Sequence, residues 1–273
     1  MPRIRLRANA LIGSILVGAT LLLAAASIVW TPRNPLAVAL RQRLKPPSAE
    51  FWLGTDEVGR DVFSRIMTGA GTSVMVAGLA VLAAVLLGSL LGLVAGFLRG
   101  WVDRVLMGIN DALLAFPGIL LALGLMAVIG ASQWGIILAL GLAYAPTVAR
   151  VVRGAVLSIR EREFVEASRS IGNSEGYTMW RHVMPNTASP LIVLATSMFG
   201  WAILAESALS FLGLGVPPPA PTWGNMLAAA RPYMESAIWL SLAPGLCIAL
   251  TLLGVNLLGD ALRDRLDPRS AER

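Results

Sequence analysis

The sequence contains very few of the side chains from which metal sites and disulfides are built. Its 273 residues include one cysteine, Cys247, one histidine, His182, and one lysine, Lys45. A single cysteine excludes an intrachain disulfide, and with a single histidine it also excludes a zinc site of thiolates or clustered imidazoles. We therefore expect this chain to bind no metal and no cofactor of its own.

A nucleotide-binding loop is missing as well. A P-loop needs the pattern GxxxxGK[ST], and the only lysine lies in RQRLKPP, which has no glycine. If ATP drives the activity, another chain supplies the ATP site. The sequence also lacks a histidine–cysteine pair and an HExxH motif, which argues against an intramembrane enzyme.

Charged residues are scarce too. They make up 14% of the chain, against about 25% in soluble domains, while 56% of the residues are hydrophobic. This composition favours a protein of the lipid bilayer. The net charge of +6 admits nucleic acid as a partner, but arginines in loops between apolar runs are better explained by membrane orientation.

The apolar residues are collected into six runs, each close to the ~20 residues with which a helix spans a bilayer. The runs cover residues 10–30, 72–98, 106–129, 134–156, 189–212 and 237–258. Backbone groups in lipid must be satisfied within each segment, so we predict an all-α bundle of six transmembrane helices. The first run is too long for a signal-peptide core and is expected to be retained. We also predict a short interfacial helix at 62–67 and a kink at Pro117.

The placement of basic residues predicts the orientation. Of the 22 arginines and lysines, 15 lie in residues 1–9, 99–104, 150–185 and 259–273, and 7 lie in residues 31–70 and at Arg231. Basic residues accumulate on the cytoplasmic side of membrane proteins. Both termini and residues 150–185 are therefore predicted to be cytoplasmic.

Residues 160–186 form the one long polar segment with helical periodicity between apolar runs. Phe164, Ala167 and Ile171 are spaced to line one side of a helix, which Gly172 can end in a left-handed conformation. A second helix follows, capped by residue 173 or 174, with Trp180 and either residue 183 or 184 on its apolar side. We expect Pro185 to end it. The prediction is two short helices at a sharp angle outside the membrane, with an apolar stripe that must rest on another surface.

This segment resembles the EAA loop of ABC importer permeases, whose pattern is Glu-Ala-Ala, three residues, Gly, nine residues, then Ile-x-Leu-Pro. The matching positions are Glu166, Ala167, Gly172 and Pro185, and the departures are Ser168 for Ala, His182 for Ile and Met184 for Leu. In that family the loop docks into a groove on a separate ATPase subunit and transmits its motion. Without the resemblance, the segment is an ordinary cytoplasmic helical hairpin.

A second motif lies between the first two runs. Locally, residues 53–61 predict bends at two glycines and a solvated helix cap. The stretch also resembles the C-type permease subunit of the dipeptide, oligopeptide and nickel branch, which carries LGTD, two residues, then GRD. The residues are Leu53, Gly54, Thr55, Asp56, Gly59, Arg60 and Asp61. The stretches LAESALSFLGLG and PTWGNML, at 204–215 and 221–227, resemble the same branch.

The resemblance implies the type I ABC importer permease architecture and a role in di- or oligopeptide import, with nickel chelates or other small solutes as alternatives. Its implied partners are a second permease, two ATP-binding subunits that hold ATP and magnesium, and an extracytoplasmic solute-binding protein. The implied location is the bacterial plasma membrane. We expect residues 1–70 to hold the first span and an extracytoplasmic segment, residues 71–265 the five-helix core, and residues 266–273 a cytoplasmic tail.

Five residues inside the spans are further candidates. Gly88, Gly92 and Gly96 recur at every fourth position and predict a close approach by another helix. Asp111 and Glu206 are carboxylates within apolar runs, where an unpartnered charge is costly. Asp111 either faces the protein interior or extends to the interface, and Glu206 either lies along the pathway or bonds a neighbouring helix. A pair of intramembrane carboxylates is also a mark of ion-coupled secondary transporters, the alternative from another class.

The predicted orientation can be tested with a single cysteine. In a Cys247→Ala background, a cysteine at Ser174 should react with a membrane-impermeant thiol reagent only when the cytoplasmic side is opened. Labelling in intact, unpermeabilised cells would contradict the orientation.

Overall fold

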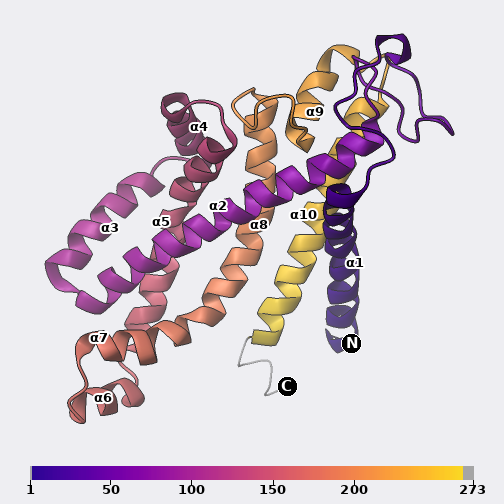
Figure 1. Ribbon diagram of the computed structural model, residues 1–273. Coiled ribbons are helices and arrows are strands. Elements are labelled where there is room, and N and C mark those ends of the chain that lie inside the picture. Colours follow the sequence, from indigo (N-terminus) through magenta and orange to yellow (C-terminus); the bar gives the residue numbers. More distant parts are fainter. Residues whose placement is uncertain (1, 267–273) are drawn as a thin grey trace.

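The computed structural model describes residues 2–266 as an assembly of long helices (Figure 1), and no β-strand occurs among them. The long helices are α1 (Pro2–Val29), α2 (Val62–Leu98), α5 (Gln133–Ile159), α8 (Ala188–Phe211) and α10 (Trp239–Leu266). The shorter ones are α3 (Gly100–Leu114), α4 (Gly118–Ile129), α6 (Glu163–Ser170), α7 (Glu175–Thr178) and α9 (Trp223–Ala230). The all-α prediction is confirmed. The tail expected at 266–273 lies, beyond Leu266, outside the described residues.

Among the described residues, five helices are long and apolar enough to cross a membrane, and there are six such spans if α3 and α4 are counted together as one. These two helices are bent by 92° at their junction. The amide of Phe116 still bonds back to Leu113, whereas Leu120 and Leu121 bond to the carbonyl of Pro117, where a new helix starts. The kink expected at Pro117 is therefore a full break between two helices.

Helix α2 differs from the prediction at its start. It runs without interruption for 37 residues from Val62, so residues 62–67 are its first turns and not a separate interfacial helix. The hydroxyls of Thr68 and Thr72 bond to the carbonyls four residues earlier, which lets these polar residues remain inside the helix. The division expected between residues 70 and 71 lies within α2.

The long helix α2 packs along α5 through three glycines. A β-carbon at Gly88 would lie 2.5 Å from the carbonyl oxygen of Ala145, and one at Gly92 would lie 2.5 Å from that of Ala149. At Gly96 it would lie 2.9 Å from a methyl group of Val156. Small residues every fourth position thus bring the two backbones into contact, as helices do in lipid.

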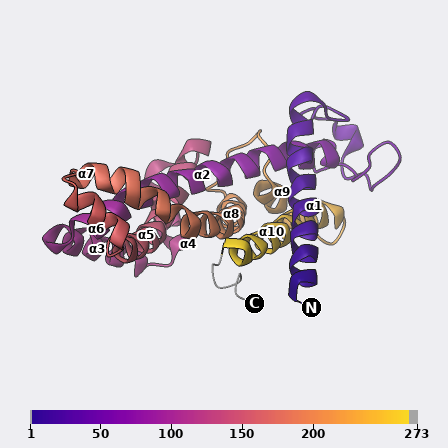
Figure 2. The same cartoon turned by 90° about the horizontal axis from the view of Figure 1, so that it is seen from below.

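The two ends of the bundle carry different elements (Figures 1 and 2). The beginning of α1 and the end of α10 point toward the end that also carries α6 and α7. The segment 30–61 and α9 lie at the opposite end. Helix α1 lies against α10, where Thr20 and Thr251 share a hydrogen bond of 2.9 Å.

The glycine contact makes a stability prediction. Gly92→Ala should lower the free energy of unfolding by about 1–3 kcal/mol, because the added methyl group forces α2 and α5 apart. The midpoint of thermal unfolding in detergent measures this. Gly245→Ala in α10 is the matched control, since a β-carbon there meets no atom within 4 Å. Equal midpoints for the two variants would show that the close contact contributes nothing.

Candidate functional site

The joint between α6 and α7 is built on Gly172. Its φ is +85°, a conformation that costs a residue with a β-carbon roughly 1–2 kcal/mol. Its amide donates to the carbonyl of Arg169 at 2.9 Å, and the next amide, of Asn173, donates to the carbonyl of Ser168 at 3.3 Å. These two bonds form a Schellman motif with glycine at its left-handed position. The predicted sharp turn is therefore present.

A small polar cluster holds the two helices together on the inner side. The hydroxyl groups of Ser168 and Thr178 are 3.0 Å apart, and the side-chain amide of Asn173 donates to the hydroxyl of Ser168 at 3.1 Å. Ser168 and Thr178 are buried. The serine that replaces alanine in the motif thus bonds to both sides of the joint.

The predicted apolar stripe faces outward. Phe164 is 40% exposed and Ile171 is 78% exposed, whereas Val165 and Ser168 are the buried residues of α6. Periodicity identified an apolar side of the helix but not the side that packs within the chain. In the next helical segment Val183 is buried, while Trp180 is 53% exposed. The element therefore carries an outward apolar surface on both sides of the Gly172 joint.

The expectation that Pro185 ends the second helix is wrong. Met184 keeps helical angles, φ −54° and ψ −48°, and the chain stays helical from Glu175 to Phe211. It does so through a π-helical turn, Met179–Val183, and a 3₁₀ turn, Met184–Thr187. The wider π turn relieves the clash of the proline ring with the preceding turn. The side chains of Asn186 and Thr187 bond to nearby carbonyls, at 2.7 Å each.

Arg160 ties this element to the end of α2. Its guanidinium donates to the carbonyls of Phe97 at 2.6 Å and Gly96 at 3.3 Å, which lack helical partners at a helix C-terminus. Burial, and to a lesser extent the charges of Arg99 and Arg169, lower the pKa of Arg160 from its ordinary value. Arg99 in turn pairs with Glu161 at 3.1 Å. Residues 160–186 thus begin at a fixed point on the bundle.

The other motif residues of this segment lie on its surface. Glu166, Ala167 and Pro185 are exposed. The carboxylate of Glu166 forms no ion pair or hydrogen bond within residues 8–264, whose side chains the structure describes. His182 is half-buried and meets the edge of Tyr177, with ring centroids 5.9 Å apart. These side chains are available to a partner.

The motif at 53–61 is buried, which corrects the expectation of a solvated cap. Asp56 accepts hydrogen bonds from the amides of Val58 and Arg60, at 3.0 and 2.8 Å, and its carboxylate pairs with Arg60 at 2.6 Å. The helix cap is Asp61, whose carboxylate accepts from the amide of Ser64 at 2.8 Å. Asp56 and Asp61 are both nearly inaccessible to solvent.

Two glycines give this motif its shape. Gly54 and Gly59 have φ of +74° and +82°. A β-carbon at Gly59 would lie only 1.9 Å from the carbonyl oxygen of Ala39. Residues 53–61 therefore pack closely against residues 39–45.

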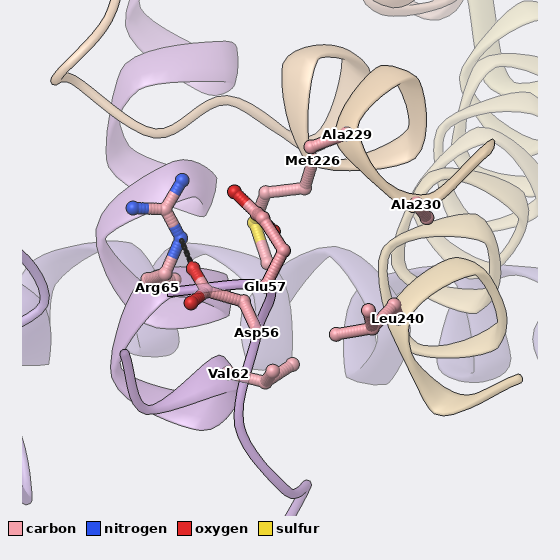
Figure 3. Close-up of a pocket in the computed structure, with 8 residues that line it drawn as sticks. All are labelled: Asp56, Glu57, Val62, Arg65, Met226, Ala229, Ala230 and Leu240. Carbon is pink, nitrogen blue, oxygen red and sulfur yellow. Dashed lines mark ion pairs between the residues drawn. The ribbon is translucent and has the colours of Figure 1, made fainter. Parts of the chain in front are cut away.

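Figure 3 shows how the motif meets α2, α9 and α10. Arg65 from α2 pairs with Asp56, with 3.5 Å between Nε and Oδ2. Glu57, Val62, Met226, Ala229, Ala230 and Leu240 line the remaining space. That space is about 10 Å³, which is no larger than one water molecule. The cluster is a structural contact with room for no more than one water molecule.

The intramembrane carboxylates have separate surroundings. Asp111 is exposed and pairs with Arg150 of α5 at 2.6 Å. Glu206 is completely buried, and it accepts hydrogen bonds from Ser73 of α2 at 3.1 Å and from Ser210 at 2.7 Å. Ser73 also accepts from the amide of Trp223 at 3.3 Å. Glu206 therefore joins α2, α8 and the start of α9 instead of facing an open pathway within this chain.

Sequence reasoning missed several contacts that shape the element. The roles of Asn173 and Thr178 depend on the fold of the joint, and their side chains gave no periodic signal. Arg160 was identifiable in principle, because a basic residue just beyond an apolar run can reach the carbonyls that end a neighbouring helix. Which helix it reaches depends on the α2–α5 packing.

Comparison with known proteins places these features in context. The model of a family described as "binding-protein-dependent transport system inner membrane component" matches residues 88–272. The dipeptide transport system permease protein DppC of Alkalihalophilus pseudofirmus is 42% identical over 260 residues, which cover 95% of this chain and 86% of that protein. The glutathione transport system permease protein GsiD of Escherichia coli is 46% identical over 223 residues, 82% of this chain and 74% of that protein.

A solved structure shares the fold. A chain of the inward-facing MetNI methionine ABC transporter superposes with a TM-score of 0.62 over 74% of this chain and 96% of that chain. At 16% sequence identity this similarity concerns the architecture alone.

The Glu206 cluster predicts different effects for two substitutions. Glu206→Gln retains an acceptor for the serine hydroxyls and should change the unfolding midpoint in detergent little. Glu206→Ala leaves buried hydroxyls unpaired and should cost about 1–3 kcal/mol. Glu235→Ala, which removes an exposed carboxylate, is the control. Equal destabilisation by Gln and Ala would show that the cluster requires the carboxylate itself.

Proposed function

Because the chain belongs to the family of binding-protein-dependent transport system inner membrane components, we propose that it is the permease subunit of an ABC importer for di- or oligopeptides. The protein is an integral membrane protein with the type I permease architecture. The names of its relatives, which are permeases for dipeptides, peptides and glutathione, support short peptides as the substrate class over nickel chelates.

The observation that carries the coupling role is the outward apolar surface around Gly172. Phe164, Ile171 and Trp180 are exposed and lie outside the apolar runs 134–156 and 189–212, which are predicted to cross the membrane. Exposed apolar groups that cluster on one element mark a site of protein association. The element is also rigid, because the Schellman bonds and the Ser168 cluster fix the angle between its helices.

The continuity of the chain beyond this surface supports transmission of motion. The helical path from Glu175 to Phe211 has 37 residues, which correspond to ~55 Å measured along the path. A displacement at α7 therefore moves the start of α8 directly, without a flexible loop between them. This favours a model in which an ATPase subunit holds α6 and α7 and shifts α8 within the membrane.

The remaining parts of the transporter belong to other chains in this proposal. A second, related permease completes the translocation pathway, two ATPase subunits bind ATP and magnesium, and an extracytoplasmic binding protein delivers the peptide. The end of the bundle with α6 and α7 faces the cytoplasm, as the distribution of basic residues predicts. Residues 30–61 then face the binding protein.

The ion-coupled alternative finds no support in the carboxylates. Such a mechanism needs intramembrane carboxylates at one site near the midplane. Asp111 is paired with Arg150 at an exposed position, and Glu206 is enclosed by serines on another part of the chain.

The proposed substrate class is tested by uptake. A strain deleted for this gene should lose uptake of a labelled dipeptide that the partner binding protein retains in a binding assay, and the plasmid-borne gene should restore it. Uptake of nickel chelate alone, with peptide uptake unchanged by the deletion, would reject the peptide assignment.

The coupling surface predicts a specific defect for Gly172→Asp. A β-carbon at Gly172 meets no atom within 4 Å, so the chain should fold and reach the membrane at normal levels. The new side chain would strain the joint and project a charge from the docking surface. We expect loss of peptide uptake and loss of ATPase co-purification with the tagged permease.

Gly130→Asp is the matched control, because Gly130 also has a positive φ, +90°, and open surroundings, but lies between α4 and α5. It should keep the ATPase bound. Glu166→Ala should also weaken coupling, because its exposed carboxylate has no partner among the side chains that the structure describes and is available to an arginine of the ATPase. Intact co-purification and coupled ATP hydrolysis in Gly172→Asp would reject residues 160–186 as the coupling element.

A further inference from the structure

Phe97, in the last turn of α2, lies where this helix meets α5 and α6. Its side chain is buried, and it belongs to the same apolar core as Val165 of α6. Two guanidinium groups also lie over the ring. That of Arg160, which ends α5, is 5.7 Å from the ring centroid, and that of Arg169, in the last turn of α6, is 5.8 Å from it. One side chain of α2 is therefore in contact with the residues on both sides of α6.

The ring of Phe97 brings together two like charges. The charge of Arg169 is one of the causes, after burial and Arg99, that lower the pKa of Arg160. The face of an aromatic ring carries a negative potential that attracts a guanidinium group within about 6 Å of its centroid. Arg160 also bonds to the carbonyls at the end of α2. Within residues 8–264, the ring is the only group of α2 with which Arg169 makes a printed polar or cation–π contact.

Arg169 extends this contact across the Gly172 joint. Its Nη2 donates to Oε2 of Glu175, the first residue of α7, at 3.2 Å. An exposed pair of this kind contributes little to stability, but it orients the guanidinium between the two helices. Since the Schellman bonds already fix the angle of the joint, a displacement of α6 or α7 carries Arg169 with it, and Arg169 acts on Phe97.

We infer that Phe97 is a positioning residue of the transport cycle, which makes the end of α2 move with α6 and α7 when an ATPase subunit displaces them. The inference rests on the proposed coupling function and extends it, because the continuity of the chain carries the motion to α8 alone. Toward its other end, α2 is joined to α8 by the hydrogen bond from Ser73 to Glu206, ~36 Å from Phe97 along the helix. The two spans are thus linked at two distant levels and tilt together.

The first test measures peptide uptake and ATP hydrolysis together, in vesicles that contain the complete transporter. Phe97→Leu keeps an apolar side chain but removes the ring. It should leave the ATPase bound, yet lower the amount of peptide imported per ATP hydrolysed about fivefold, as expected for the loss of a cation–π contact of ordinary strength. Phe199→Leu is the matched control and should keep the ratio, because Phe199 is a half-buried residue of α8 with no cation over its ring within residues 8–264.

Variants of Arg169 identify the contact itself, and they remain informative if Phe97→Leu reaches the membrane poorly, because Arg169 is partly exposed. Arg169→Met should lower the ratio as Phe97→Leu does, and Arg169→Lys, which keeps a cation, should lower it less. The double variant Phe97→Leu/Arg169→Met should be no worse than either single variant, since all three lack the same contact. Additive losses would overturn the inference. Loss of the ATPase from the Arg169→Met complex would place Arg169 in the docking surface and would overturn it as well.

Spin labels test the common movement directly. In a Cys247→Ala background, cysteines in place of Leu98 and Glu163, both exposed, put one label at the end of α2 and one on α6. Electron paramagnetic resonance should give the same distance between the labels in the nucleotide-free and the ATP-bound complex, and Phe97→Leu should make this distance change when ATP binds. A distance that changes equally with and without Phe97 would overturn the inference.

The two levels of the proposal fail in different ways. If the tagged wild-type chain retains no ATPase, the coupling function is wrong and the role of Phe97 fails with it. If the ATPase is retained and Phe97→Leu imports as much peptide per ATP as Phe199→Leu, the coupling function stands and only the role of Phe97 is rejected.

Discussion

The close backbone contact between α2 and α5 is the interaction on which the rest of the structure depends. Three glycines on one side of α2 let the two helices meet at the level of their backbone atoms. In lipid, where apolar side chains gain nothing by leaving their surroundings for one another, such contacts are a main source of helix association. Because the contact extends to Gly96, it brings the end of α5 to the end of α2, where Arg160 finds the free carbonyls. The base of the coupling element is thereby placed by the same packing that holds the bundle.

Polar side chains inside the bundle follow a second constraint. Two of the buried carboxylates join different elements: Glu206 of α8 accepts from Ser73 of α2, and Asp56 of the 30–61 segment pairs with Arg65 of α2. In a chain this poor in charge, buried polar groups serve as fixed junctions between helices. Thr20 and Thr251 do the same for α1 and α10 with neutral groups. The outermost helix is thus held by a hydrogen bond as well as by apolar contact.

The sequence was sufficient for the parts of the structure that depend on local chemistry. Apolar runs defined the spans, and the spacing around Gly172 defined the joint. The sequence was insufficient where local chemistry allowed two conformations or orientations and tertiary packing selected one of them. Periodicity identified the stripe of Phe164 and Ile171. It could not show whether this side of α6 packs against the chain or faces outward, because that depends on the packing of α6 against the bundle. Proline usually ends a helix, but here a π turn and two side-chain hydrogen bonds accommodate Pro185 within one. The solvated reading of Asp56 was wrong because burial by α9 and α10 is a property of distant segments.

The path of the chain through Pro185 has a mechanical meaning. A loop between α7 and α8 would transmit tension but not bending, and its slack would absorb small displacements. A helix transmits both. Its upper part is fixed sideways by the hydrogen bonds of Glu206 to α2, so a push applied below it acts on a long arm about that point. A small tilt of the helix about Glu206 would displace α7 by a larger distance. A force applied at α7 would likewise act with leverage on the serines around Glu206. The π-helical turn at Met179–Val183 keeps this arm helical between α7 and α8.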